Sequence, residues 1–87
     1  MVYVIVVYDM QADRTHLLLK FLRRYLTHVQ NSVFEGEVTE GDLETIETRI
    51  DSILEPDEST IIYEVSSEKL LQREVFGDDP TEDQRFL

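Results

Sequence analysis

The sequence predicts an α+β fold in which two helices pack on one face of a four-stranded antiparallel sheet. Three observations support this prediction: an unbroken apolar run near the start, two segments with apolar residues at helical spacing, and short alternating runs that follow each segment. The resulting order, βαββαβ within 87 residues, is that of a ferredoxin-like sandwich. Because a chain of this length has room for one small core, we expect a single domain over residues 1–65.

The first strand is expected over Val2–Tyr8, a run of β-branched and aromatic residues that stops at Asp9. The run is too short to span a bilayer and too unbroken for a strand with one face in water, so it is typical of a central strand covered on both faces. Asp9 then lies at the carboxyl end of this strand, where ligand sites often form. A lone aspartate at such a place also commonly closes a turn, and both interpretations remain open.

The first helix is expected to begin at Asp13, a candidate cap, and to end near His28. Its apolar stripe consists of Leu17, Leu18, Phe21, Leu22, Tyr25 and Leu26. The opposite face is basic and, with the start of the helix, carries Arg14, Lys20, Arg23 and Arg24. These four cations are half of the lysines and arginines of the chain. They form either a contact surface for phosphates or a solvated helix face.

The remaining three elements follow from turn and capping signals. A tight β-hairpin is expected over residues 29–38, with its turn at Asn31-Ser32. The second helix is expected to begin at Thr39, which with Asp42 resembles a capping box, and to end before Pro56. Its apolar stripe consists of Leu43, Ile46, Ile50, Ile53 and Leu54. The fourth strand is expected over Thr60–Val65.

Two helices on one face leave the other face of an apolar sheet uncovered. We therefore expect a homodimer in which the open faces of two sheets meet. Residues 66–76 are expected to form a dimer arm that contains an additional C-terminal strand over Gln72–Phe76, added to a sheet edge such as that of the second copy. Residues 77–87 are expected to form a mobile acidic tail, whose last residues, Phe86-Leu87, either dock on a partner or fray.

The net charge of −11 is distributed unevenly along the chain. Residues 1–34 contain four basic and two acidic side chains, whereas residues 35–87 contain four basic and seventeen acidic ones. An acid-rich surface with two lysines against six arginines is typical of adaptation to high salt, where the Debye length is about 3 Å at 1 M. An ordinary acidic protein is the alternative, and a halophilic source is our expectation.

Several classes of protein are disfavoured by composition. The absence of cysteine excludes disulfides and thiolate metal sites. Residues 1–20 show no basic leader region, and no apolar stretch reaches transmembrane length, so we expect a cytoplasmic protein with no membrane association. His16 and His28 are too far apart, without an acidic partner at ligand spacing, to indicate a zinc site.

Three features together resemble the small CRISPR-associated endoribonuclease family, the lesser partner of the integrase in spacer acquisition. These are Tyr8-Asp9 after an aliphatic strand, Arg23-Arg24-Tyr25 near the end of the first helix, and the stretch VQNSVFEGE over residues 29–37. The resemblance covers about residues 1–65. It implies a ferredoxin-like homodimer in which the two copies of Asp9 approach the two-fold axis and share one Mg²⁺. A hard cation relieves the repulsion of two close carboxylates, and water bound to it can attack a phosphodiester.

The resemblance implies two roles. In the enzymatic role, Asp9 is both the catalytic residue and the metal ligand of an endonuclease acting on RNA or DNA. Tyr8 and Phe34 are its candidate accessory residues, although packing in the core is the alternative for both. In the adaptor role, the homodimer bridges two dimers of the CRISPR integrase and contacts the backbone of double-stranded protospacer DNA. The cations that would make those contacts are Arg14, Lys20, Arg23 and Arg24.

The charge of the chain favours the adaptor role. A protein of net charge −11 holds a duplex weakly in high salt, so a partner must supply affinity. His28 stands where many family members have an arginine, which reduces the cationic contacts further.

The third hypothesis is a ferredoxin-like sensor of a small ligand without a role in nucleic-acid chemistry, but no glycine-rich ligand loop supports it.

Overall fold

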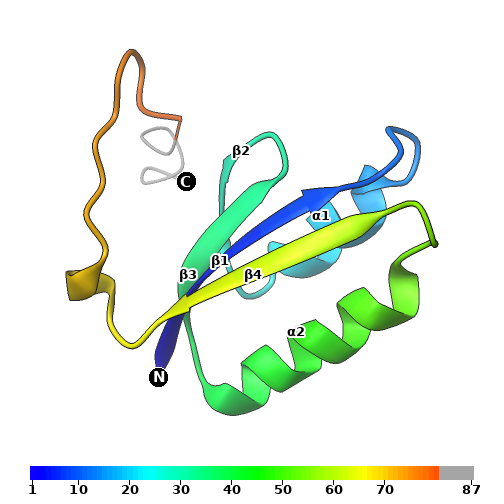
Figure 1. Ribbon diagram of the computed structural model, residues 1–87, viewed down its shortest axis with the longest axis horizontal. Helices are drawn as coiled ribbons and strands as arrows, with labels where there is room; N and C mark the ends of the chain where they lie inside the picture. The colour runs from blue at the N-terminus through cyan, green and yellow to red at the C-terminus, as the bar shows by residue number, and fades with distance from the viewer. Residues whose placement is uncertain (81–87) are drawn as a thin grey trace.

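The central element of the fold is β1 (Val2–Asp9), which pairs with a strand on each side (Figure 1). The computed structural model describes residues 1–80 of the chain. The other elements in this range are α1 (Thr15–Leu22), β2 (Thr27–Gln30), β3 (Val33–Val38), α2 (Glu40–Ile53), β4 (Ser59–Val65) and the 3₁₀ helix η1 (Glu68–Leu70). The four strands form one antiparallel sheet in the order β2-β3-β1-β4. The predicted α+β class and the order βαββαβ are therefore confirmed.

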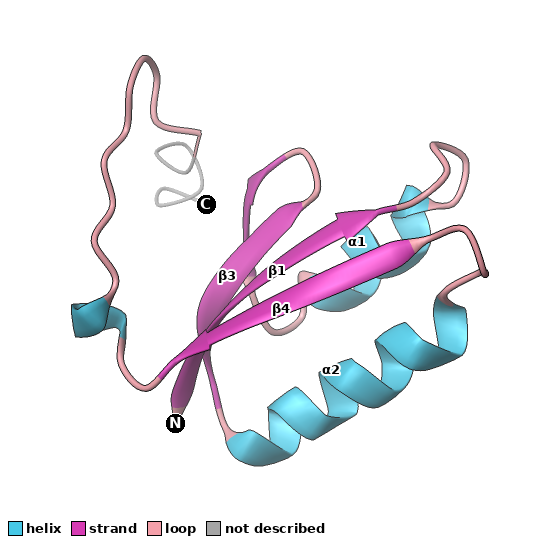
Figure 2. Cartoon of the chain, viewed as in Figure 1, coloured by secondary structure: helices cyan, strands magenta, loops and turns pink. Residues whose placement is uncertain are grey.

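The core lies between the sheet and the two helices. Alternation along β1 directs Val4, Val6 and Tyr8 toward the helices, and all three are buried. They pack in one cluster with Leu18 of α1 and Ile46 of α2, both of which have no exposed surface. Figure 2 shows both helices on the same side of the sheet. This face of the sheet needs no further cover.

The opposite, open face is apolar and only partly covered. Ile5 of β1 stands beside Tyr63 of β4, and Val7 stands beside Ile61. Tyr63 and Ile61 are large apolar side chains that keep 56% and 51% of their surface exposed. An apolar surface of this kind in the middle of a sheet is typical of a protein contact.

α1 is shorter than the sequence predicts. The expected cap, Asp13, does not cap it: the N-cap position is Arg14, and no side chain caps the free N–H groups of the first turn. The helix ends at Leu22, and the chain then turns through residues 23–25 instead of continuing to His28. The reason is tertiary, because Leu26 is buried in the core and residues from Thr27 onward pair with β3.

Gly36 allows this change of direction. A Cβ at position 36 would lie 3.2 Å from Cδ2 of Leu26, which is closer than side chains usually approach. A glycine in β3 therefore lets Leu26 sit directly against the sheet, and β2 begins at the next residue.

The hairpin and the second helix follow the local signals closely. Asn31 adopts a left-handed conformation (φ 44°) in the turn between β2 and β3, as its residue type favours. Thr39 caps α2, because its hydroxyl accepts a 3.0 Å hydrogen bond from the Asp42 backbone N–H. The helix ends at Ile53, before Pro56, as predicted.

The fifth strand expected over Gln72–Phe76 does not form within this single chain. After η1, residues 71–76 have no strand pairing, and Figure 2 shows them as a loop beside the sheet. Arg73 forms an ion pair with Glu35 of β3, whose Oε2 also accepts a 3.0 Å hydrogen bond from the Tyr3 hydroxyl. Side-chain contacts therefore hold this segment near the sheet, and its backbone is not paired with either edge strand. Of the expected tail, residues 81–87, including Phe86 and Leu87, lie outside the described residues.

Within residues 1–80, neither α-helix has the length and apolar composition that a membrane span requires.

Candidate functional site

Asp9 is the last residue of β1, and its side chain is exposed. Its register partner is Ser59, the first residue of β4. Alternation along β1 places Asp9 on the open face with Val7, whereas Tyr8 points into the core. The predicted carboxylate at the end of a rigid strand is therefore present, on the same face as the exposed Ile61 and Tyr63.

One protomer supplies few ligands for a metal at this place. Within residues 1–80, no group of three or more histidine, aspartate or glutamate side chains is arranged to hold a metal ion. A carboxylate oxygen suits Mg²⁺, which takes one or two protein carboxylates and completes its shell with water and phosphate oxygens. Asp9 therefore fits Mg²⁺ as a single ligand, and a tighter site needs a second carboxylate from outside this chain.

The aromatic candidates lie in the core and not beside Asp9. Phe34 has no exposed surface and Tyr8 has 4%. The two rings are stacked with their centroids 6.2 Å apart, and the ring of His28 stacks on Phe34 at 4.7 Å. Burial raises the pKa of the Tyr8 hydroxyl, and the charge of Arg23 opposes this shift. Core packing, the alternative interpretation of both residues, is what the structure shows.

Three of the four predicted cations remain on the surface. Lys20 lies at the end of α1, and Arg23 and Arg24 lie in the turn that follows it; all three are exposed. Arg14 is different, because its side chain is directed inward. Its Nε donates a 2.9 Å hydrogen bond to Oε2 of Glu58, and its Nη2 donates a 2.7 Å hydrogen bond to the carbonyl oxygen of Ile53. The expectation that Arg14 belongs to an open phosphate-binding face is therefore corrected.

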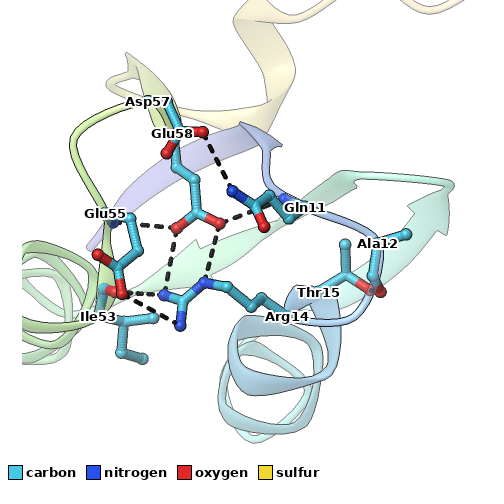
Figure 3. Close-up of polar contacts among 8 residues, drawn as sticks. All are labelled: Gln11, Ala12, Arg14, Thr15, Ile53, Glu55, Asp57 and Glu58. Atoms are coloured by element: carbon cyan, nitrogen blue, oxygen red, sulfur yellow. Dashed lines mark hydrogen bonds and ion pairs between the residues drawn. The ribbon is translucent and has the colours of Figure 1, made fainter.

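Glu58 is the residue that the sequence reasoning missed. Its side chain is only 1% exposed, and its carboxylate accepts hydrogen bonds from Arg14 and from the backbone N–H groups of Gln11 and Glu55 (Figure 3). These contacts join the β1–α1 loop to the α2–β4 loop next to the Asp9–Ser59 pair, which is the last pair of the β1–β4 ladder. A glutamate before a strand gives no signal of such a role, because its main partner is 44 residues away.

The electrostatics of Glu58 follow from these donors. The hydrogen bond from Arg14 is the largest influence and lowers the pKa of the Glu58 carboxyl from 4.5 to about 2, with the Glu55 and Gln11 N–H groups acting in the same direction and burial opposing them. The same contact raises the pKa of Arg14. Both groups therefore carry their charges at neutral pH.

Comparison with known proteins gives a consistent picture at the level of sequence. The family described as CRISPR associated protein Cas2 matches residues 1–73. The chain is 47% identical over 77 residues to the CRISPR-associated endoribonuclease Cas2 2 of Archaeoglobus fulgidus, covering 87% of this chain and 84% of that protein. It is 42% identical over 83 residues to the CRISPR-associated endoribonuclease Cas2 of Haloferax volcanii, covering 95% and 96%.

Solved structures give the same picture at the level of the fold. A crystal structure titled as that of cas2 superimposes with a TM-score of 0.82 and 41% identity, covering 90% of this chain and 88% of the other. The crystal structure of Streptococcus pyogenes Cas2 at pH 6.5 superimposes with a TM-score of 0.65 and 26% identity, covering 98% and 94%.

The Arg14–Glu58 pair predicts a pH dependence of stability. Because the folded state depresses the pKa of Glu58, the pair stabilises the fold fully above pH 4.5, and this stabilisation is lost as pH falls from 4.5 toward about 2. The difference in unfolding free energy between wild type and Glu58→Gln, measured by urea denaturation, should be constant from pH 7 to 5 and shrink below that.

The matched control is Glu55→Gln, because Glu55 contacts the same arginine at 3.5 Å but is 53% exposed. Its effect at neutral pH should stay within about 0.5 kcal/mol. A difference between wild type and Glu58→Gln that persists unchanged to pH 2 would contradict the assignment.

Proposed function

The chain belongs to the CRISPR-associated protein Cas2 family, which takes part in CRISPR adaptation, and from this membership we propose a homodimeric adaptor with a metal-dependent endonuclease centre at Asp9. The observation that supports it best is the position of Asp9 at the edge of an exposed apolar sheet face. The hypothesis of a small-ligand sensor has no observation in its favour.

The proposed dimer is supported by the open face of the sheet. Ile61 and Tyr63 are half exposed and stand next to Val7 and Ile5. A domain of this size has little core of its own, so covering this face with a second copy adds apolar burial. In a two-fold arrangement, the same residues of both copies meet, and residues near the axis approach their own symmetry mates.

The proposed metal centre follows from the dimer. Asp9 lies on the same face, so a two-fold axis that passes close to Asp9 would bring two carboxylates together and supply the second ligand that one chain lacks. We assign them one shared Mg²⁺ per dimer, which when bound supplies Lewis acidity and an activated water for phosphodiester cleavage. The relatives are named endoribonucleases, which supports RNA as a substrate, with DNA as the other candidate.

The proposed adaptor role uses the exposed cations. Lys20, Arg23 and Arg24 gather at one end of α1, and a dimer presents this group twice. We propose that they contact the backbone of double-stranded protospacer DNA while the CRISPR integrase supplies most of the affinity. The acidic, lysine-poor composition supports a halophilic source, in whose cytoplasm electrostatic contacts with DNA alone would be weak.

The first prediction from the proposed function concerns the dimer. Tyr63→Lys places a charge in the centre of the open face and should weaken self-association by about thirtyfold or more, as expected for a central aromatic anchor. Thr48→Lys is the matched control, because Thr48 is exposed on α2 in the helical layer. Light scattering after size exclusion, over a range of concentrations in molar salt, measures the effect. A monomeric wild type would refute the dimer.

The second prediction separates cleavage from assembly. Asp9→Asn keeps the shape of the side chain but removes its charge, so Mg²⁺-dependent cleavage should fall at least about a hundredfold, a loss of a few kcal/mol of transition-state stabilisation. Chelation of the metal should have the same effect on wild type. Dimerisation and spacer integration with the integrase should persist.

Asp13→Asn is the control for this experiment, since Asp13 is an exposed aspartate in the loop after β1. Cleavage at the wild-type rate by Asp9→Asn would show that the activity comes from a contaminating nuclease. Loss of integration in the same variant would contradict the separation of the two roles.

The third prediction concerns the exposed cations. Changing Lys20, Arg23 and Arg24 to glutamine should weaken DNA retention by the complex with integrase and reduce the slope of log affinity against log salt by about 1 per lost phosphate contact. Lys69→Gln is the control, because Lys69 is exposed in η1 and outside this group. An unchanged slope would remove these residues from the DNA interface.

A further inference from the structure

The Glu58 carboxylate is the best-satisfied buried charge in the described part of the chain. Oε2 accepts hydrogen bonds from Nε of Arg14 at 2.9 Å and from the Gln11 N–H at 3.2 Å. Oε1 accepts from the Glu55 N–H at 3.0 Å and from Nη2 of Arg14 at 3.2 Å. Two oxygens therefore fix the side chain of Arg14 and two backbone segments at once (Figure 3).

These contacts lie just beyond the end of the strand pair that contains Asp9. Asp9 is the last residue of β1 and Ser59 is the first of β4, so their pair is the last of the ladder. Glu58 directly precedes Ser59, and Gln11 follows Asp9 by two residues. The hydrogen bond from the Gln11 N–H to Glu58 thus joins the two strands just beyond Asp9, where strand ends otherwise fray.

Stability alone is a weak reason for a buried ion pair at this place. Apolar residues of similar volume often stabilise a protein as well as a buried pair does, because both charges must lose water. A bidentate contact between a guanidinium and a carboxylate also fixes the orientation of the two side chains relative to each other. Arg14 extends this order to the end of α2, because its Nη2 also donates to the carbonyl oxygen of Ile53.

We propose that Glu58, held by Arg14, is a positioning residue: it ties the loop just after Asp9 to the start of the neighbouring strand and so sets the geometry of the Asp9 carboxylate for a divalent metal. The inference rests on the proposed metal centre. A shared site makes the demand on the position of Asp9 stricter. Any displacement of Asp9 occurs in both protomers, and both displacements change the distance between the two carboxylates. Metal ligands are held to within about 0.5 Å by their supporting residues.

The test measures metal affinity directly. Mn²⁺, which replaces Mg²⁺ and is visible by electron paramagnetic resonance, is titrated into the wild-type dimer and into Glu58→Gln, well below the melting temperature of each. Loss of a residue that supports a ligand typically weakens metal binding 10- to 100-fold, so we expect about a tenfold higher dissociation constant for Glu58→Gln. The half-saturating metal concentration for cleavage should rise equally, with less than about a threefold change in kcat at saturating metal.

The controls separate this inference from a purely structural role. Glu64→Gln makes the same chemical change at an exposed position of β4 and should leave Mn²⁺ affinity at the wild-type value. Should Glu58→Gln fail to fold, Glu58→Asp keeps the charge but shortens its reach, and the same rise in dissociation constant is expected. Light scattering and thermal melting confirm that each variant is a folded dimer.

The outcomes are distinguishable. Wild-type Mn²⁺ affinity in a folded Glu58 variant, together with a loss of binding in Asp9→Asn, would overturn the positioning role and leave the metal centre standing. Equal Mn²⁺ binding by wild type and Asp9→Asn would overturn the metal centre and this inference with it.

Discussion

β1 is too apolar to leave either of its faces in water, and the packing of the whole domain follows from this. The helices cover one face, where Val4 and Val6 have no exposed surface. The other face carries Ile5 and Val7 beside the exposed Tyr63 and Ile61 of β4, and the chain itself covers it only in part. A domain this small gains much of its stability from apolar burial, so the uncovered face is the natural place for a second copy.

The same alternation that creates this face also determines on which face Asp9 and Tyr8 lie. Asp9 emerges on the open side because it is an even number of residues from Ile5 and Val7, whereas Tyr8 is buried against Phe34. A carboxylate and an exposed apolar surface therefore share one sheet face. In the proposed function, the surface that assembles the protein and the residue that performs its chemistry cannot be separated, because the former brings two copies of the latter together.

The basic residues of the chain divide into two groups with different physical roles. Lys20, Arg23 and Arg24 remain in water, where salt screens their charges. Arg14 is committed to the buried carboxylate of Glu58, where salt screens it much less. Arg14 therefore serves the fold near the end of β1 and does not belong to the exposed cationic group.

Local patterns are enough to predict the order of the elements, the hairpin turn at Asn31, the Thr39 cap and the position of Asp9 at a strand end. All of these depend on periodicity and on hydrogen bonds between residues a few positions apart. The end of α1 cannot be predicted in this way, because it depends on the contact of Leu26 with β3. The same is true of the pairing of Arg14 with Glu58, 44 residues away. Such features follow from which surfaces meet after folding, and no local pattern encodes that.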